Sequence, residues 1–183
     1  MKLISASKSK FAGVFFAFAG ILGAHSGIAQ DVAEPRVSLE PAWVVGAADG
    51  GERLVEGARP EGAVQRLYTA RFRYEGTRPA PRLRIVLGIP DGMNYVANSA
   101  LGPGAEIRFS VDGGRSFGAP AELSLSPAAD DPEGEPRAAR IADYSHIRWE
   151  LAGPHLPGVA GLVSFRAVPG DGGRDDSAAP ETP

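Results

Sequence analysis

The sequence predicts an all-β protein, an antiparallel two-layer immunoglobulin-like sandwich of about seven strands. After residue 30, apolar and polar residues alternate with a period of two in several short segments. This period is typical of strands in a sheet that has one face in water. The segments recur every 8–12 residues or so, with glycine or proline between them, as in sandwiches and barrels. No long window after residue 30 sustains the apolar spacing of a helix.

The first thirty residues have the organisation of a secretory signal peptide. Three lysines precede the apolar run 11–23, and small residues follow it. Such a run is too short to cross a bilayer, and small residues suit a cleavage site. We expect cleavage after Ala29, with cleavage after Ser26 as the alternative. The expected location is therefore periplasmic or secreted.

The rest of the chain is predicted to hold one domain, because its length allows a single large core. After the signal peptide (1–29) we expect a short leader (30–34), then the β-sandwich domain (35–169). Residues 170–183 are polar, lack an apolar run, and predict a disordered tail.

Composition excludes several classes of function. The chain has no cysteine, so disulfides, thiolate chemistry and a lipid anchor on cysteine are excluded. Its formal charge is −3, and all lysines lie in the predicted signal peptide, so the remainder is more acidic still. An acidic chain is repelled by nucleic acid and by anionic lipid. We therefore expect no nucleic-acid partner. No second apolar run approaches the length needed to span a bilayer, so we expect no membrane insertion after cleavage.

The strands can be placed from the alternation. The first strand region runs from Val37 to Val45 and is expected to break at Pro41, because proline has no N–H to donate. Residues 49–62 are rich in Gly, Glu and Pro and predict a long loop. Five further strands are predicted over residues 67–74, 82–89, 106–111, 146–151 and 159–168.

In each of these strands one set of alternate residues is apolar, and arginine is frequent in the other set. The apolar set is expected to face the core, and arginine to cover the solvent face with its aliphatic stem. The predicted core residues are Ile85, Leu87, Ile107, Phe109, Trp149 and Phe165.

Residues 110–117 (SVDGGRSF) predict a tight hairpin turn. Gly113 and Gly114 can adopt the positive φ that such turns need, and Asp112 can bond the backbone two residues on. Phe109 and Phe117 are expected to pack together at its base. The segment resembles an Asp-box, Ser-x-Asp-x-Gly-x-x-aromatic, which implies a structural hairpin. A single copy in a chain too short for a propeller carries no glycosidase function.

A second resemblance covers residues 67–168. Residues 89–96 (IPDGMNYV) are similar to the proline-x-glycine-x-x-tyrosine-valine step of bacterial conserved-repeat domains, called domain of unknown function eleven. Further agreement with a single-copy exported subgroup lies in residues 105–123, 144–149 (YSHIRW), 156–158 (LPG) and 163–167 (VSFRA). The resemblance implies an immunoglobulin-type sandwich in an exported protein, with no established chemistry.

One position departs from that family pattern. The family places Asn-Thr-Gly after the tyrosine-bearing strand, whereas this chain has Glu75-Gly76-Thr77. Gly76 still allows a turn there. Independently of the family, Pro90 is expected to end a strand and Gly92 to permit the following turn.

Candidates for catalysis are few. His146 lies beside Ser145 and near Asp143, which supplies the residue types of a hydrolase. Adjacent residues of a strand point to opposite faces, however, so Ser145 and His146 are not expected to bond as nucleophile and base. His155 lies in a proline-bounded loop, and two histidines without cysteine do not favour zinc. We therefore predict no enzyme, no catalytic or metal site and no cofactor.

Two further groups of residues have the composition of a binding site. The acidic loop from Asp130 to Glu135 has the carboxylates of a calcium site but not the spacing of an EF-hand, and a solvated loop is the preferred interpretation. Trp43 and Trp149 could stack on sugars, but their apolar surroundings favour core packing.

Three hypotheses of function remain from the sequence. The preferred one is a non-catalytic structural or interaction module of the bacterial envelope, which binds an unknown envelope protein or glycan through loops or a sheet edge. The second is a carbohydrate-binding module, which requires exposed aromatics among Tyr68, Tyr74, Tyr95 and Tyr144. The third is a hydrolase centred on His146.

Overall fold

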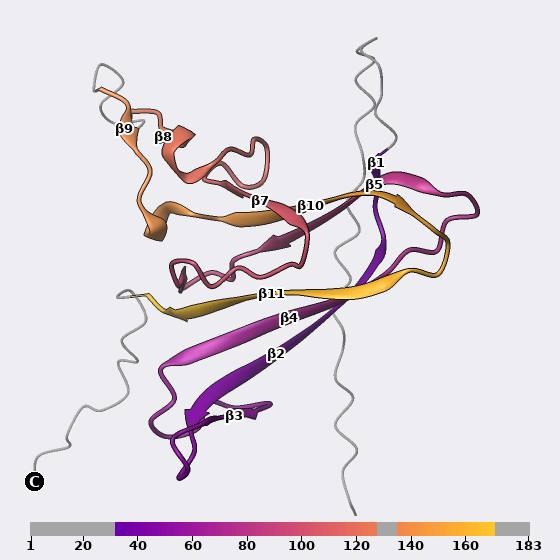
Figure 1. Cartoon of the computed structure of the whole chain (residues 1–183). Coiled ribbons are helices and arrows are strands. Elements are labelled where there is room, and N and C mark those ends of the chain that lie inside the picture. Colours follow the sequence, from indigo (N-terminus) through magenta and orange to yellow (C-terminus); the bar gives the residue numbers. More distant parts are fainter. Residues whose placement is uncertain (1–31, 128–134, 171–183) are drawn as a thin grey trace, which may run out of the picture.

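The structure is a computed structural model that describes residues 32–127 and 135–170 (Figure 1). The predicted signal peptide, residues 171–183 of the predicted tail, and residues 130–134 of the acidic loop lie outside the described residues. The described part is built almost wholly of strands, with two three-residue 3-10 helices, η1 (Pro120–Glu122) and η2 (Ile141–Asp143). The prediction of an all-β fold is confirmed.

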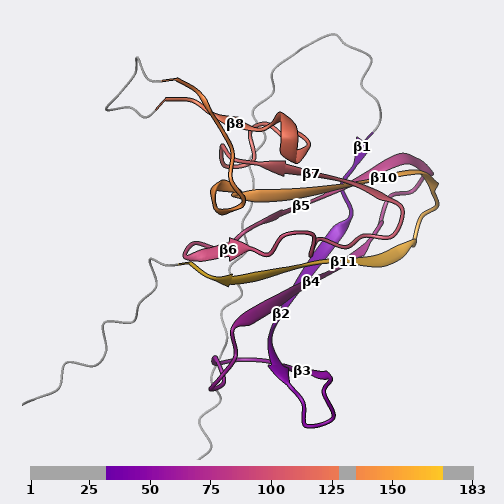
Figure 2. The ribbon, with the colours of Figure 1, turned by 60° about the vertical axis from the view of Figure 1, so that its left-hand side comes forward.

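Two sheets pack face to face as the layers of a sandwich (Figures 1 and 2). One has the order β1-β5-β10-β7 and the other the order β3-β2-β4-β11-β6. The four-stranded sheet consists of β1 (Val32–Ala33), β5 (Ala80–Gly88), β10 (His146–His155) and β7 (Ala105–Ser110). The five-stranded sheet consists of β3 (Glu52–Val55), β2 (Arg36–Gly46), β4 (Gln65–Arg73), β11 (Ala160–Pro169) and β6 (Met93–Tyr95).

The neighbours within the two sheets are antiparallel except for β1, which runs parallel to β5. The sheets hold nine strands, against about seven expected from the spacing of the segments. Three strands have no predicted counterpart: β1 lies in the predicted leader, β3 lies in the predicted long loop 49–62, and β6 follows the predicted turn at Gly92. A separate two-stranded ribbon pairs β8 (Ser124–Leu125) with β9 (Arg137–Ala138).

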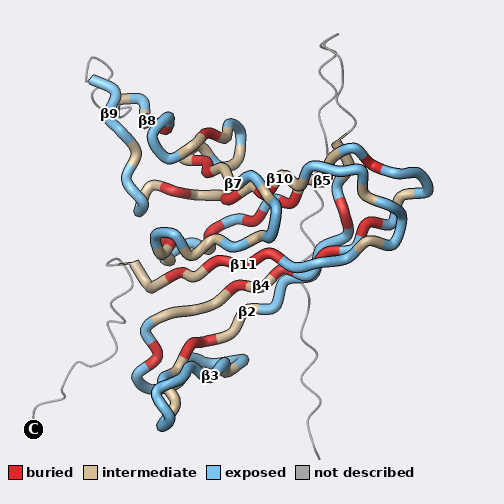
Figure 3. Tube along the Cα trace, in the orientation of Figure 1, coloured by how far each residue is buried: buried red, intermediate tan, exposed pale blue. Residues whose placement is uncertain are grey.

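The core forms where alternate apolar side chains of the two sheets meet (Figure 3). In the four-stranded sheet, register places Ile85 opposite Trp149 and Trp149 opposite Ile107. In the other sheet Phe165 lies opposite Tyr68, and their rings stack with centroids 4.9 Å apart. Of the six predicted core residues, five are buried and Ile107 is partly exposed, because β7 is an edge strand.

The strand β2 continues through Pro41, so the predicted break is wrong. The backbone orientation explains why. The N–H of Ala47 donates to the carbonyl of Gly51 on the β3 side (2.8 Å), and peptide groups alternate along a strand, so those of odd-numbered residues face that side. Pro41 therefore withdraws no bond from β4, and proline is tolerated at such an edge.

The turns predicted from glycine at positions 92 and 158 are present. Gly92 and Gly158 have φ of 73° and 86°, and the N–H of Met93 donates to the carbonyl of Pro90 (3.0 Å). Gly76 has a different role from the one expected: the ring of Tyr74 lies against it, so that a Cβ at this position would meet the Tyr74 hydroxyl at 2.1 Å. The glycine is required there by close packing.

Candidate functional site

The feature with the clearest capacity for binding is the edge of β2. The strand has eleven residues, but β3 pairs only with its last four, Trp43 to Gly46. Among the described residues, none pairs with the other seven, 36–42, on the β3 side. In Figures 1 and 2, β3 and the adjoining end of β2 lie away from the facing sheet, whereas β2 begins close to β1 of that sheet. We call residues 36–42 the β2 edge.

The backbone of the β2 edge offers hydrogen bonds to an added strand. Because odd-numbered residues face the β3 side, the N–H and carbonyl groups of Val37 and Leu39 point outward from the sheet. Pro41 contributes its carbonyl alone. A row of unpaired groups at a sheet edge is a template for pairing with another chain.

Two large apolar side chains of the β2 edge are exposed. Val37 and Leu39 share a face with the buried Phe72 and Ala70 of β4, but they are themselves exposed. Their exposed fractions are 38% and 46%. They form an exposed apolar strip on this face of the sheet.

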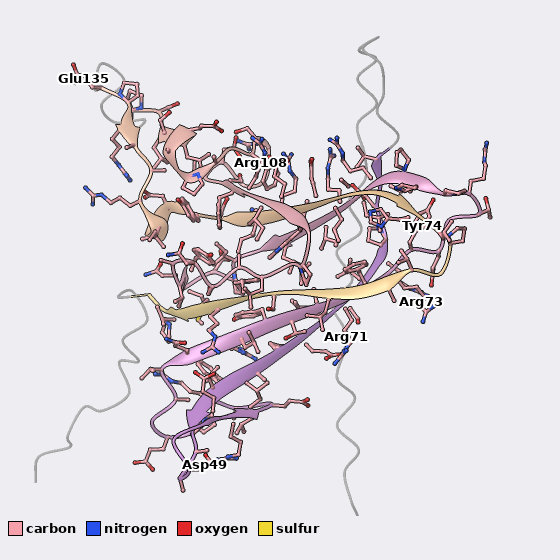
Figure 4. All side chains as sticks on the ribbon, viewed as in Figure 1. Asp49, Arg71, Arg73, Tyr74, Arg108 and Glu135 are labelled. Carbon is pink, nitrogen blue, oxygen red and sulfur yellow. The ribbon has the colours of Figure 1, made fainter. Side chains whose placement is uncertain are left out.

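The opposite face of the same strands is charged. Arg71 contacts both carboxylate oxygens of Glu40 (3.1 and 3.0 Å), and Arg36 lies 3.5 Å from Glu75. Figure 4 shows Arg71 and Arg73 on this outer side of the sheet. The four paired side chains are all more than half exposed, so each pair stabilises the fold little.

A hollow of about 400 Å³ lies beside the β2 edge on this charged face. Two carboxylates, Glu40 and Glu56, line it together with Arg71. The apolar lining includes Leu54 of β3, whose side chain is 54% exposed. The hollow thus combines apolar walls with an excess of negative charge.

The residues of the hydrolase hypothesis are brought together only in part. Ser145 Oγ lies 3.2 Å from Nδ1 of His146, so the expectation that they could not bond is wrong. The two side chains can meet because β10 begins only at His146. Ser145 precedes the strand, so the rule that adjacent strand residues point to opposite faces does not apply to this pair. Asp143 lies elsewhere, in a two-bond pair with Arg137 (2.7 and 2.8 Å) that lowers its pKa to about 2.

The hydroxyl of Ser145 serves the hairpin beside it. It lies 3.1 Å from the carbonyl oxygen of Ser110, to which it can donate, and it accepts from the N–H of Gly113 (3.1 Å). Burial lowers the pKa of His146, with Asp112 opposing this shift. His155 lies 3.0 Å from the carbonyl of Leu151, within its own strand.

The predicted Asp-box turn is present and is held by Asp112. Gly113 and Gly114 have φ of 75° and 84°, as expected. One Asp112 oxygen accepts from the N–H groups of Arg115 and Ser116 (both 3.0 Å), three and four residues on instead of the expected two. The hydroxyls of Ser110 and Ser116 donate to the same carboxylate at 2.7 and 2.6 Å. These bonds, led by that from Ser116, hold the pKa of Asp112 far below its ordinary value.

The two phenylalanines at this hairpin do not pair as predicted. Phe109 packs inward against Tyr95 and Tyr144, with ring centroids 5.1 and 4.7 Å apart. Phe117 lies on the outer face, where the guanidinium of Arg148 covers its ring at 4.6 Å.

The outer face of the four-stranded sheet carries a charge network around Glu150, whose side chain is only 11% exposed. Arg82, Arg84 and Arg148 approach its carboxylate at 3.5, 3.5 and 3.1 Å. Arg108, at the top of Figure 4, contacts Glu106 on the same strand. The arginines of this face are therefore paired with carboxylates in a partly buried ion-pair network.

The tyrosines that a sugar platform requires are not available. Tyr68, Tyr74, Tyr95 and Tyr144 are all buried, with at most 9% exposed. Trp43 and Trp149 are buried too, as predicted; the guanidinium groups of Arg59 and Arg66 lie over the Trp43 ring at 5.3 and 5.1 Å. The carbohydrate hypothesis loses the aromatic groups on which it was built.

No family model, no curated protein and no solved structure matches the chain. Within residues 32–127 and 135–170, no group of three or more metal-ligating side chains could hold an ion. No helix of the same residues is long and apolar enough to cross a membrane. Of the acidic loop, only Glu135 is described, and it is exposed. The site must therefore be interpreted from its own geometry.

Sequence reasoning did not find the β2 edge. A signal was present, because Val37 and Leu39 alternate with polar residues directly before Pro41. Proline is placed on edge strands or at bulges, and not in central strands. The pattern could thus have been interpreted as an edge strand instead of a broken one.

Proposed function

We propose that this chain is a non-catalytic interaction module of the bacterial cell envelope, exported by the signal peptide expected over residues 1–29. It binds an extended protein segment by strand addition at the β2 edge. The observation that carries this proposal is the β2 edge, unpaired among the described residues, with outward peptide groups and exposed Val37 and Leu39. Strand addition uses main-chain bonds for affinity and alternate side chains for specificity.

Three further observations support an interaction module that binds protein. The Ser145 hydroxyl and the Asp143 carboxylate are engaged with backbone and arginine groups that hold the hairpin and η2 in place. The resemblance to exported conserved-repeat domains points to the same class of module. The acidic balance of the chain favours protein surfaces over nucleic acid or anionic lipid.

The proposal is tested by affinity capture of envelope proteins on the full chain. The test variant is Leu39→Lys, because an edge lysine opposes strand pairing. Its control is Leu162→Lys, on β11, since Leu162 and Leu39 are equally exposed at 45% and 46%. We expect a captured protein to be lost with Leu39→Lys and kept with Leu162→Lys. Equal capture by all three chains would contradict a role for the β2 edge.

A further inference from the structure

We propose that the partner at the β2 edge is a second copy of this chain, with the two β2 strands antiparallel about a twofold axis at Leu39. This inference rests on the proposed function and names its partner. Twofold symmetry requires a self-complementary surface. If residue i of one copy contacts residue j of the other, residue j of the first copy contacts residue i of the second. The β2 edge has this property in its backbone, its apolar strip and its charges.

The length of the β2 edge sets the register. It spans seven residues, 36–42, and Leu39 is its centre. At one end Val55 of β3 occupies the position opposite Trp43 and blocks further pairing. At the other end β2 is preceded by β1, which belongs to the facing sheet. A register centred on Leu39 pairs the two edges over their whole length.

The backbone bonds suit this register. Leu39 faces Leu39 of the second copy, and both exchange N–H and carbonyl bonds, because the peptide groups of odd-numbered residues point outward. Val37 faces Pro41, and its N–H donates to the Pro41 carbonyl. The missing N–H of Pro41 removes one bond at each end of the pairing and leaves the centre intact.

The side chains on both faces of β2 are compatible with this register. On the apolar face, Val37, Leu39 and Pro41 of each copy form one continuous strip. On the charged face, Arg36 of the second copy lies opposite Ala42, directly over the hollow whose lining includes Glu40. Glu40 is its diagonal neighbour, within reach of a long side chain. Arg36 is free to move there, since its side chain is 76% exposed and its contact with Glu75 is long, at 3.5 Å.

A cysteine cross-link tests the register, because the chain has no cysteine of its own. In Leu39→Cys the two thiols belong to a directly opposed pair, whose Cα atoms are about 5.5 Å apart, within the range for a disulfide. In Val37→Cys the two cysteines are offset by four residues, about 14 Å along the strands. Leu162→Cys is the control for disulfides that form when two molecules meet at random, because Leu162 is about as exposed as Leu39.

We expect mild oxidation of the full chain to give a disulfide dimer with Leu39→Cys, at a rate at least about tenfold above those of Val37→Cys and Leu162→Cys. Equal rates for the three variants would overturn the register. Circular dichroism of each reduced variant checks that the fold is unchanged.

Charge reversal tests the contact of Arg36 with Glu40. In Arg36→Glu alone, and in Glu40→Arg alone, like charges meet across the axis, so self-association should fall. In an equimolar mixture of the two variants, both contacts of a mixed dimer again join a carboxylate to a guanidinium, so association should return. Sedimentation up to about 1 mM measures this, because small interfaces associate weakly. A mixture no more associated than its components would contradict the contact.

The two proposals can fail separately. A chain that stays monomeric over the whole concentration range, with no preferred cross-link at residue 39, overturns the second copy as partner. If Leu39→Lys still abolishes capture of another envelope protein in that case, strand addition at the β2 edge stands with a different partner. If neither assay depends on Leu39, both proposals are overturned.

Discussion

Replacing Asp112 by alanine should destabilise the fold strongly, although the residue lies in a surface turn. The carboxylate accepts four hydrogen bonds, two from hydroxyls and two from backbone N–H groups. Arg115 and Ser116 are exposed, so water replaces part of what is lost. Because water competes at this exposed turn, each bond is taken at about 0.5–1 kcal/mol, below the usual value for bonds to a charged group, and Asp112→Ala then costs about 2–4 kcal/mol.

Urea unfolding of the purified domain at neutral pH measures this cost. With a slope of about 2 kcal/mol per molar urea, the midpoint should fall by about 1–2 M without a change in slope. Asp49→Ala is the control, because exposed Asp49 accepts a single bond, from the N–H of Gly51 (3.0 Å). The control should change stability by less than about 0.5 kcal/mol. Equal effects of the two variants would refute the role assigned to Asp112.

The contribution of Asp112 to stability should depend on pH. Because the folded protein lowers the pKa of Asp112 far below that of an unfolded aspartate, about 3.9, the carboxylate stabilises the fold above that pH. As pH falls from about 4 toward the folded value, protonation removes this contribution. The stability difference between the wild type and Asp112→Ala should therefore shrink from about pH 6 to about pH 2.5. A stability difference that stays constant over this pH range would show that the charge of Asp112 does not contribute to stability.

Three further predictions concern packing and titration. Gly102→Ala should lower the free energy of unfolding in urea by about 1–3 kcal/mol, because the new Cβ would lie 2.6 Å from Cδ1 of the fully buried Trp149. Gly46→Ala is the control: its Cβ would have no other atom within 4 Å, and it should change stability by less than about 1 kcal/mol. Tyr74→Phe should cost about 1 kcal/mol in the same assay, since the buried hydroxyl donates to a backbone carbonyl at 2.8 Å, and an unchanged midpoint would contradict this. Burial lowers the pKa of His146 below 6.5, so stability should fall as pH drops below about 6.5, and His146→Gln should remove that part of the pH dependence. A wild type and variant with parallel pH profiles would argue against it.

The strands were predictable because their local pattern and their tertiary role agree. In β4, β5, β10 and β11 every second residue is apolar over most of the strand, and the structure buries those residues between the sheets. The errors lie where the pattern was weak or ambiguous. Strand β3 was interpreted as loop because Glu52–Val55 is short, exposed and surrounded by glycine. Its only partner among the described strands is the end of β2, a contact that no local rule specifies.

The candidate site shows the same division. The alternation of Val37 and Leu39 indicated a strand, but not that these two side chains would remain exposed. Which edge remains unpaired depends on the order of all strands, and therefore on contacts between distant residues. The turn at Asp112 was predictable because its bonds lie within seven residues, and only their offset was wrong.

The amino-acid order by itself determined the β character of this chain, the inward faces of its strands, and its glycine turns. These depend on backbone sterics and on the two-residue repeat of an extended chain, which act over a few neighbouring positions. The tertiary structure alone decided the partner of each strand, the burial of all four tyrosines, and the exposure of one edge of β2. Those outcomes follow from how two sheets of unequal width cover one another, which requires the whole chain to be in place.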